Sequence, residues 1–162
     1  MTQHHLNYDA ISENYNQRYP SNLHWERGDA LLDLAHRMDA RFVLEVGSGT
    51  GFWLNLLHQT TSQLYGLDFS AGMIAQARNQ PAPLKLTRGT AVQLPYRAES
   101  FDLLYCVDAI HHFGNHAAFV REAASLHPDG DAVAAIMEKA EKPLGEGGDN
   151  AVPAVRRQLQ ER

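Results

Sequence analysis

The sequence is poor in cysteine, in long apolar runs and in clustered basic residues. Its one cysteine, Cys106, excludes a disulfide within the chain and is consistent with a reducing compartment. No stretch approaches the roughly 18 consecutive apolar residues that a membrane-spanning helix requires. The polar N-terminal residues also lack the apolar segment of a signal peptide. We therefore expect a cytoplasmic protein with no membrane partner.

The charge balance argues against a nucleic-acid partner. The chain has 14 Lys and Arg against 19 Asp and Glu, which gives a formal net charge of −5. No basic patch that could contact a phosphate backbone stands out. With 162 residues, 44% of them apolar, the chain has the length and composition of one globular domain with a buried core.

The most informative stretch is a glycine-rich turn. An apolar run of strand length, residues 42–46, is followed by three glycines at alternate positions, Gly47, Gly49 and Gly51, with Ser48 between the first two. Residues 52–58 can form a helix. Glycine lets a ligand approach the backbone closely, and the free N–H groups of a helix N-terminus face such a ligand. The pattern predicts a nucleotide-type cofactor site at the carboxyl end of a first strand.

The identity of the cofactor depends on two details of this turn. In a dinucleotide-binding fingerprint the third glycine would stand at position 52, where this chain has Phe52. Glu45, two residues before Gly47, would favour a cationic headgroup and repel a pyrophosphate. The Glu-x-Gly-x-Gly-x-Gly pattern resembles motif I of the class I S-adenosylmethionine-dependent methyltransferases. The resemblance implies S-adenosylmethionine as the cofactor, with Glu45 at its aminoacyl end.

A second strand, residues 63–67, leads to another acid. Asp68 follows the glycine turn by about 20 residues, where a carboxylate can accept hydrogen bonds from both ribose hydroxyls. Ser70 is then expected to cap a helix. The segment 67–74 resembles the methyltransferase segment that follows motif I. This resemblance implies that Phe69 and Met73 pack against the adenine, although both are also plausible core residues.

Three further strands are expected at residues 84–87, 101–107 and 132–137. The loop at residues 89–96 resembles the family's Gly-Asp-Ala-x-x-Leu-Pro segment, which implies that Thr90, Ala91 and Val92 cover the adenine. Thr90 stands where the family commonly has aspartate. A neutral acceptor in place of a carboxylate predicts cofactor binding weaker by about 1 kcal/mol. Cys106, in the fourth strand, is another candidate cofactor contact, and a small buried apolar residue is the alternative interpretation.

The expected fold is α/β: a doubly wound, mostly parallel sheet with strand order 3-2-1-4-5 and helices on both faces. We expect helices at about residues 7–19, 23–38 and 117–126, and residues 1–38 as a helical cover. Residues 1–138 would form the cofactor-binding domain. The resemblance ends near residue 137, so the family's last two strands would be partly or wholly missing. Residues 139–162 would form a Gly- and Pro-rich tail with at most a short helix, and a second copy of the chain could cover the open edge of strand five.

Several polar and aromatic residues allow two interpretations. Tyr8 and Tyr15 are core-packing aromatics or, by resemblance, part of a lid over the cofactor. His111 is a weak candidate for a substrate-side general base, with packing as the alternative. Asp108 is expected to be a loop acid that faces water. His112 and His116 have helical spacing, but nothing completes a metal-ligand set, so we expect no metal.

The leading functional hypothesis is methyl transfer from S-adenosylmethionine to a small-molecule acceptor by in-line attack on the sulfonium methyl. Alignment of the reactants can supply roughly 7–11 kcal/mol of the barrier. This chemistry needs few obligatory catalytic side chains, and the sequence identifies none firmly. The alternative is a non-catalytic module that binds the cofactor or acts within a complex. A nicotinamide dehydrogenase is disfavoured by the position of the third glycine.

Overall fold

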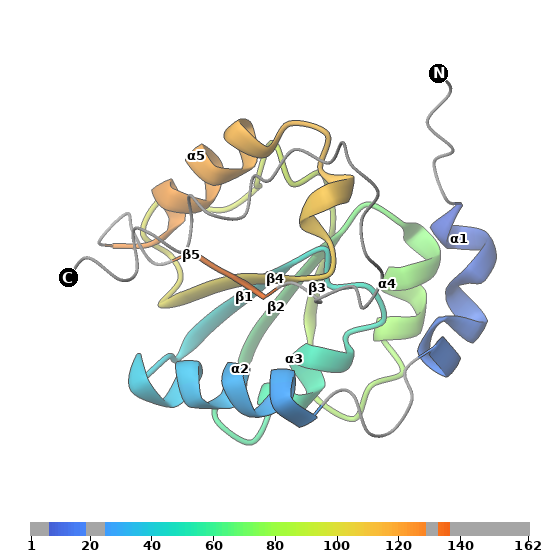
Figure 1. Cartoon of the computed structure of the whole chain (residues 1–162), viewed down its shortest axis with the longest axis horizontal. Coiled ribbons are helices and arrows are strands. Elements are labelled where there is room, and N and C mark those ends of the chain that lie inside the picture. Colours follow the sequence, from blue (N-terminus) through green and yellow to red (C-terminus); the bar gives the residue numbers. More distant parts are fainter. Residues whose placement is uncertain (1–6, 19–24, 129–132, 137–162) are drawn as a thin grey trace, which may run out of the picture.

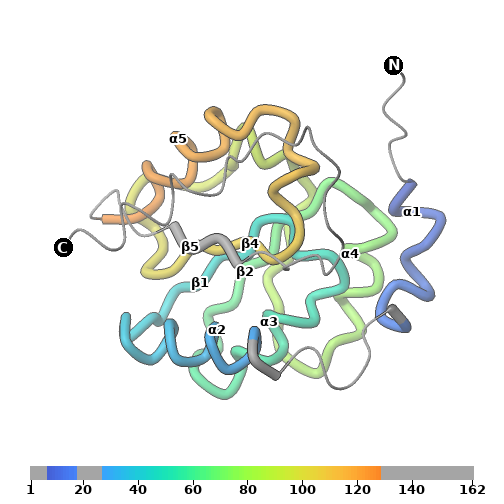
Figure 2. The backbone as a smooth tube through the Cα atoms, in the orientation of Figure 1, coloured from blue at the N-terminus to red at the C-terminus, as the bar shows by residue number. Residues whose placement is uncertain are grey.

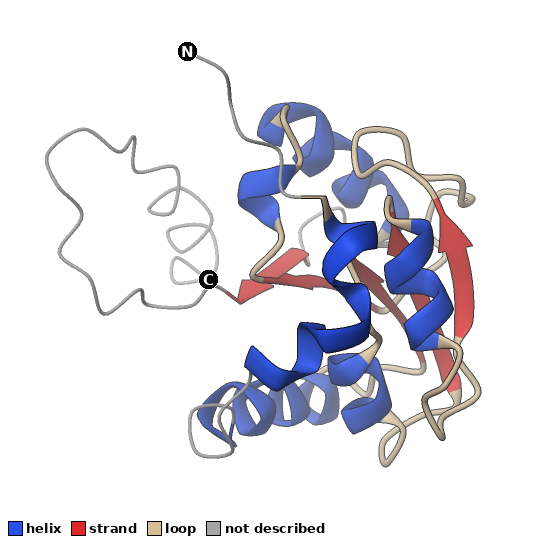
Figure 3. Ribbon diagram, turned by 90° about the vertical axis from the view of Figure 1, so that its right-hand side faces the viewer, coloured by secondary structure: helices blue, strands red, loops and turns tan. Residues whose placement is uncertain are grey.

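A parallel β-sheet with helices on both faces forms the centre of the protein (Figures 1 and 3). The computed structural model describes residues 7–18, 25–128 and 133–136. In chain order the elements are α1 (Tyr8–Ile11), the 3₁₀ helix η1 (Ser12–Arg18), α2 (Trp25–Arg37), β1 (Phe42–Val46), α3 (Phe52–Leu57), β2 (Gln63–Asp68), α4 (Ala71–Ala77), β3 (Lys85–Arg88), β4 (Leu103–Val107), the 3₁₀ helix η2 (Ile110–His112), α5 (His116–Leu126) and β5 (Val133–Ile136).

The sheet has the strand order β3-β2-β1-β4-β5, and each neighbouring pair is parallel. This confirms the order expected from the sequence. In the central strand, β1, Val43 is opposite Leu64 of β2 on one side and Leu103 of β4 on the other. The chain runs from β1 to β2 toward one edge of the sheet and from β4 to β5 toward the other, which creates a switch point between β1 and β4 where α/β proteins bind ligands.

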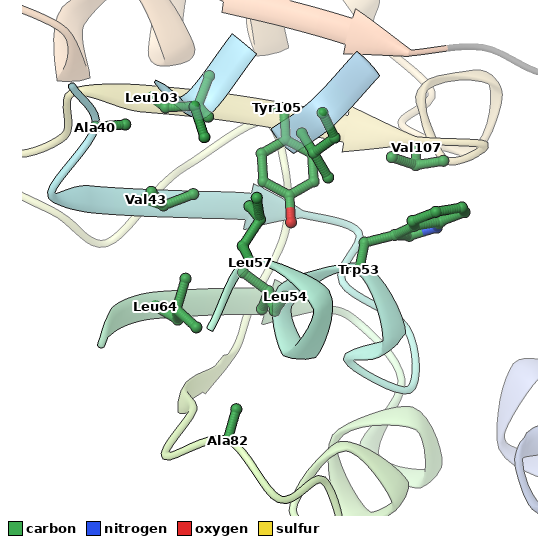
Figure 4. Packing of buried hydrophobic residues seen from close by; sticks show 12 residues of the cluster. Ala40, Val43, Trp53, Leu54, Leu57, Leu64, Ala82, Leu103, Tyr105 and Val107 are labelled. Atoms are coloured by element: carbon green, nitrogen blue, oxygen red, sulfur yellow. The ribbon is translucent and has the colours of Figure 1, made fainter. Parts of the chain in front are cut away.

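Two apolar clusters hold the helices on the sheet. In Figure 1, α2 and α3 lie below the sheet. Leu31 of α2 belongs to the first cluster, and Figure 4 shows Leu54 of α3 in the same cluster. On the opposite face, Phe119 of α5 belongs to the second cluster. All five residues of β4 are buried, as expected for a strand covered on both sides. Leu31 and Ala35 of α2 are both buried in the first cluster, so this helix packs on the sheet through an apolar face.

The N-terminal segment differs from the prediction of one helix over residues 7–19. It forms one turn of α-helix and then a 3₁₀ helix. At the junction, the Ser12 hydroxyl donates to the Asp9 carbonyl oxygen at 3.0 Å. An α-helix would use that carbonyl for the N–H of Glu13, so the serine side chain competes with the helical pattern.

Two other expectations are corrected by side chains that bind backbone groups. Strand four begins at Leu103 rather than residue 101, and the Asp102 carboxylate before it accepts the N–H groups of Arg41 and Phe42 at 2.9 and 2.8 Å. His112 and His116 do not share a helix, because Asn115 caps a new one, α5, by accepting the Ala118 N–H.

The expectations for the C-terminal part are not tested. Strand five is present as Val133–Ile136 and pairs with β4. The predicted tail over residues 139–162, and any strands or partner covering β5, lie outside the described residues. Within the described part of the chain, no helix is long and apolar enough to cross a membrane.

The turn before α3 predicts a stability difference between two glycine substitutions. Gly51 has a φ of +73°, and an added Cβ would lie 2.7 Å from Leu84 Cδ1 and 3.2 Å from Ala77 Cβ. Gly51→Ala should therefore lower the free energy of unfolding by about 2–4 kcal/mol, through backbone strain and overpacking together. Urea unfolding measures this loss.

Gly114→Ala is the matched control, because it measures the cost of the left-handed backbone conformation without overpacking. Gly114 has a φ of +68°, but no atom lies within 4 Å of an added Cβ. Its substitution should cost only about 1–2 kcal/mol. Equal losses in the two variants would contradict the close packing described around Gly51.

Candidate functional site

The glycine turn between β1 and α3 is bound to the end of β2 by backbone hydrogen bonds. The N–H groups of Gly47 and Ser48 both donate to the Leu67 carbonyl oxygen, at 2.7 and 3.0 Å. The Gly49 N–H donates to Asp68 Oδ2 at 2.8 Å. The turn and the acid predicted to bind a ribose therefore form one unit at the carboxyl edge of the sheet.

Asp68 is a structural as well as a candidate binding residue. Its second oxygen, Oδ1, accepts the Ser70 N–H at 2.8 Å, next to the start of α4. Burial raises the pKa of Asp68 above its ordinary value, and hydrogen bonds from the amides of Ser70, Gly49 and Phe69 oppose this rise. Since a carboxylate oxygen can accept more than one hydrogen bond, these contacts are compatible with ribose hydroxyls as further donors.

Open space lies over the centre of the turn. An added Cβ at Gly49, whose φ is +52°, would meet nothing within 4 Å, whereas one at Gly47 would lie 2.4 Å from Ala109 Cβ. Gly47 and Gly51 thus allow close packing of the neighbouring side chains, and Gly49 leaves the backbone open to approach. A ligand can come closest to the chain at Gly49.

Ser48 adds a polar group that the surrounding protein does not satisfy. Its side chain is 4% exposed, and its Oγ has no hydrogen-bond partner. The hydroxyl lies over Gly66 of β2, where an added Cβ would be only 2.8 Å from Ser48 Oγ. Buried hydroxyls are normally hydrogen-bonded. A ligand with a polar group at this position would supply the partner.

Glu45 is more deeply buried than a headgroup contact at the surface would be. It is 1% exposed, and its Oε2 accepts the Tyr105 hydroxyl at 3.2 Å. The Tyr105 ring belongs to the apolar layer shown in Figure 4. Burial raises the pKa of Glu45 well above its ordinary value; the Tyr105 hydrogen bond opposes this rise, and the negative charge of Asp68 adds to it.

A small pocket joins these groups. It is lined by Glu45 and the turn residues Gly47, Ser48, Gly49 and Thr50, together with Tyr15, Phe52, Trp53 and Val107. Glycine-turn backbone, a carboxyl group and aromatic rings therefore meet at the carboxyl edge of the sheet. The convergence of these polar groups with aromatic rings makes the hollow a candidate small-ligand site.

The other residues predicted to contact the cofactor differ in burial. Met73 and Cys106 are each 1% exposed, which matches the alternative interpretation of both as core residues. Burial raises the pKa of the Cys106 thiol to about 12, so it is not a reactive thiolate. Phe69 is 74% exposed, beside Asp68, and the Arg88 guanidinium lies 6.0 Å from the centre of its ring.

The loop expected over the adenine follows β3. Thr90 forms an isolated antiparallel bridge with Gln93, and the Thr90 Oγ1 accepts the Val92 N–H at 3.4 Å. Ala91 is buried and belongs to the cluster beneath α5, while Thr90 and Val92 are half-buried. The threonine that replaces the family's aspartate thus orders its own loop.

The N-terminal segment covers this edge of the sheet and lies beside α4 (Figure 2). A 2.5 Å hydrogen bond joins Tyr8 Oη to His112 Nε2, and the ring centres of Tyr8 and Tyr15 are 6.1 Å apart. His111 is exposed, and its ring centre lies 3.8 Å from that of His112. The two tyrosines and two histidines therefore form a continuous aromatic surface, and Tyr15 brings it to the pocket.

Three hydrogen bonds of this cover were not predicted from the sequence. Asp9 Oδ1 accepts the Ser70 hydroxyl at 2.5 Å and the Gly72 N–H at 2.8 Å, at the start of α4. Thr50 Oγ1 donates to Asn16 Oδ1 at 2.6 Å. The only sequence signal was the presence of short polar side chains in a segment with helical spacing.

The prediction that Asp108 faces water was wrong. Its side chain is 12% exposed, and its Oδ2 lies 3.1 Å from Nη1 of Arg27 in α2. Asp108 has a φ of +53°, an uncommon conformation that aspartate tolerates better than most residues. Arg27 was not predicted as a partner, because no local pattern in the sequence relates it to a residue 81 positions later.

Among the residues with described positions, no group of three His, Cys, Asp or Glu side chains could hold a metal ion. The site instead combines a glycine turn with carboxylates on β1 and β2. Comparison with known proteins then decides the family. The methyltransferase domain family matches residues 44–134, more than half of the chain and the whole of the turn, β2 and β4. The chain belongs to this family.

Individual relatives agree with the family assignment. The chain is 32% identical over 98 residues, 60% of its length, to a probable S-adenosylmethionine-dependent methyltransferase of Mycolicibacterium smegmatis. It is 32% identical over 104 residues, again 60% of its length, to a demethylmenaquinone methyltransferase of Deinococcus radiodurans. The chain covers only 38% and 42% of these two proteins, respectively.

A solved structure shows the same fold. The S-adenosylmethionine-dependent methyltransferase of Mesorhizobium loti superposes with a TM-score of 0.56 at 24% identity. The match covers 66% of this chain and 50% of that one. At this identity the likeness supports the architecture of the methyltransferase domain and carries no residue roles.

The environment of Glu45 predicts a pH-dependent contribution to stability. Its folded-state pKa is raised above the unfolded value of about 4.5, so above that pH the folded state holds a proton that the unfolded state has released. The stability that this retained proton provides is fully present below the unfolded-state pKa. It is lost as the pH rises through the folded-state pKa. Glu45→Gln should remove this loss, so the unfolding free energy of the variant should fall less between pH 5 and 8 than that of the parent.

Urea unfolding across this pH range measures the difference between variant and parent. Part of the pH dependence should remain, because the pKa of Asp68 is raised in the same direction. Glu13→Gln, at an exposed position of η1, is the matched control and should follow the parent. If the Glu45→Gln and parent curves run parallel, the buried carboxyl group does not retain its proton in the fold.

Proposed function

We propose that this methyltransferase-family chain binds S-adenosylmethionine and promotes transfer of its methyl group to a small-molecule acceptor. The observation that carries the proposal is the open approach to Gly49 between the Asp68 carboxylate and the unpartnered Ser48 hydroxyl. This arrangement fits a ligand that brings polar groups against a glycine turn. It lies within the segment that matches the family, residues 44–134.

Each part of the cofactor has a matching part of the site in this proposal. Gly47, Ser48 and Gly49 provide the surface of the turn, and Asp68 accepts hydrogen bonds from the ribose hydroxyls. Exposed Phe69 and the loop residues 90–92 flank the adenine. Glu45 lines the pocket at the expected aminoacyl end. When bound, the cofactor supplies a methyl group already activated by its positively charged sulfur.

The chain's own residues then have to align the acceptor and exclude water. Such alignment can supply roughly 7–11 kcal/mol of the barrier, so no strong catalytic base is required. The aromatic surface of Tyr8, Tyr15, His111 and His112 lies on the acceptor side in this proposal. His111 is an exposed member of this surface, and general-base catalysis by His111 stays a prediction.

Small molecules fit the acceptor role better than nucleic acids. The formal net charge of −5 disfavours a phosphate backbone, and the surface next to the pocket is aromatic. The name of the Deinococcus radiodurans relative, a demethylmenaquinone methyltransferase, also points to a small apolar acceptor. We propose a small acceptor with a planar apolar part for this chain.

Cofactor binding can be tested at the central glycine. Gly49→Ala keeps the N–H that binds Asp68 and adds a methyl group where nothing lies within 4 Å. Isothermal titration calorimetry with S-adenosylhomocysteine should show a loss of affinity of about tenfold or more, because the methyl group occupies the ligand's approach. NADH should not bind the parent.

Gly114→Ala serves as the matched control for this experiment too. It imposes a similar left-handed backbone in equally open space, outside the glycine turn in the sequence, and should bind like the parent. A parent chain that gives no heat with S-adenosylhomocysteine, or a Gly49→Ala variant that binds unchanged, contradicts the proposed site.

Transfer itself is tested by release of S-adenosylhomocysteine from S-adenosylmethionine. Small quinols and phenols should stimulate release, and duplex or single-stranded nucleic acid should not. Binding of the cofactor without any stimulated release would favour the non-catalytic alternative. Stimulation by nucleic acid alone would contradict the acceptor class proposed from charge and aromatic surface.

A further inference from the structure

The segment between β3 and β4 has no helix of its own. Residues 89–102, all of which the structure describes, belong to neither an α-helix nor a 3₁₀ helix. The hydrogen bonds within its first part are long: the Gln93 nitrogen lies 3.3 Å from the Thr90 carbonyl oxygen, and the Val92 nitrogen lies 3.4 Å from Thr90 Oγ1. Most N–H···O bonds span about 2.7–3.2 Å. These internal contacts therefore hold the loop weakly.

Helix α5 holds this segment from outside. The N–H groups of Glu99 and Phe101 donate to carbonyl oxygens in the last turn of α5, at 3.0 and 3.1 Å. The attachment nearest the loop differs in kind, because a side chain provides it: Glu122 Oε2 accepts the Leu94 N–H at 2.8 Å. A carboxylate acceptor makes such a bond stronger than a neutral acceptor would.

Glu122 belongs to a well-packed part of the fold. Phe119, Ala123 and Leu126 of α5 are buried on the sheet face opposite α2 and α3 (Figure 1). Glu122 is three residues after Phe119 and four before Leu126, so it borders this buried face of the helix. Its own side chain is half-buried. The acceptor is therefore fixed by a packed helix, whereas the donor belongs to a loop with weak bonds of its own.

The residues proposed to flank the nucleobase lie between two attachment points. At one end the Gly89 N–H donates to the Asp68 carbonyl oxygen at 3.0 Å, in the residue whose carboxylate is proposed to bind the ribose. At the other end Glu122 holds Leu94. Residues 90–92 connect these two points, so the position of the loop relative to a bound nucleobase depends on both.

We infer that Glu122 is a positioning residue, which fixes the loop of residues 90–92 against the nucleobase of the adenosyl ligand without touching the ligand. The carboxylate acts through the Leu94 N–H. Leu94 is 7% exposed, so loss of the acceptor leaves a buried N–H unpaired and releases the loop from α5. This inference rests on the proposed function and adds to it a residue outside the glycine turn and the strand ends.

Two substitutions of Glu122 test the inference. Glu122→Ala removes the acceptor, while Glu122→Gln keeps an amide oxygen that can accept the Leu94 N–H. In calorimetric titrations, S-adenosylhomocysteine should bind Glu122→Ala about tenfold more weakly than the parent, and Glu122→Gln within about threefold of the parent. Both variants keep the backbone attachments of Glu99 and Phe101 to α5, so both should fold.

Hydrogen exchange at saturating S-adenosylhomocysteine separates positioning from general damage. In the parent, the ligand should slow amide exchange both in the glycine turn, residues 47–51, and in residues 90–94. In Glu122→Ala the glycine turn should stay protected, while residues 90–94 lose their protection. Glu122→Gln should regain it. A purely structural role of Glu122 would change both segments or neither.

Ser125→Ala is the matched control. Ser125 is exposed in the next turn of α5, and its hydroxyl donates to the Glu122 carbonyl oxygen within the helix. The substitution keeps the Ser125 carbonyl oxygen, which accepts the Glu99 N–H. This variant should bind S-adenosylhomocysteine like the parent and show the same protection of residues 90–94.

The outcomes separate this inference from the proposed function. Unchanged affinity of Glu122→Ala, or equal weakening in Glu122→Ala and Glu122→Gln, would overturn the inference while the adenosyl site stands. Protection of the glycine turn without protection of residues 90–94 in the parent would overturn it as well. A parent chain that does not bind S-adenosylhomocysteine would overturn the proposed function and the inference together.

Discussion

The hydrogen bond from the Gly49 N–H to the Asp68 carboxylate is the contact on which the site depends. It ties the turn after β1 to the end of β2, so two candidate binding elements are held together. The second Asp68 oxygen extends this connection to the start of α4 through the Ser70 N–H. Because Gly49 has a φ of +52°, its amide can point at Asp68 while the space above it stays open. A side chain at this position would strain the turn and fill the ligand's approach.

Three carboxyl groups lie at the carboxyl edge of the sheet, and each has different hydrogen-bonding or ionic partners. Glu45 on β1 is buried against Tyr105, Asp68 on β2 accepts backbone amides, and Asp108 after β4 pairs with Arg27. Burial raises the pKa of the first two, and the negative charge of Asp68 contributes to the shift of Glu45. A positively charged ligand would relieve this accumulation of acidic groups. The electrostatics of the edge are thus consistent with the sulfonium cofactor that the family assignment suggests.

The N-terminal cover is attached to this edge mainly by polar contacts. Asp9 binds the start of α4, Asn16 binds Thr50 of the glycine turn, and Tyr8 binds His112 after β4. These anchor points follow three different strands, so the segment spans the site. Water can replace hydrogen bonds at exposed positions more readily than it can replace core packing. The cover is therefore less firmly held than α2 and α3, which pack on the sheet through apolar side chains.

The sequence by itself determined the fold class, the strand order, the glycine turn and the position of Asp68. The turn, the acid and the alternation of strands and helices follow from signals within short stretches: apolar runs, glycine spacing and an acid at the end of a strand. The strand order was predicted from the resemblance to the methyltransferase family. Only the tertiary structure decided that Met73 and Cys106 are buried, that Glu45 faces Tyr105 and that Asp108 is ion-paired. Arg27 and Asp108 are 81 positions apart, and Tyr8 and His112 are 104 apart. Such contacts depend on how whole elements pack, and no periodicity within one element specifies which distant side chain it will meet.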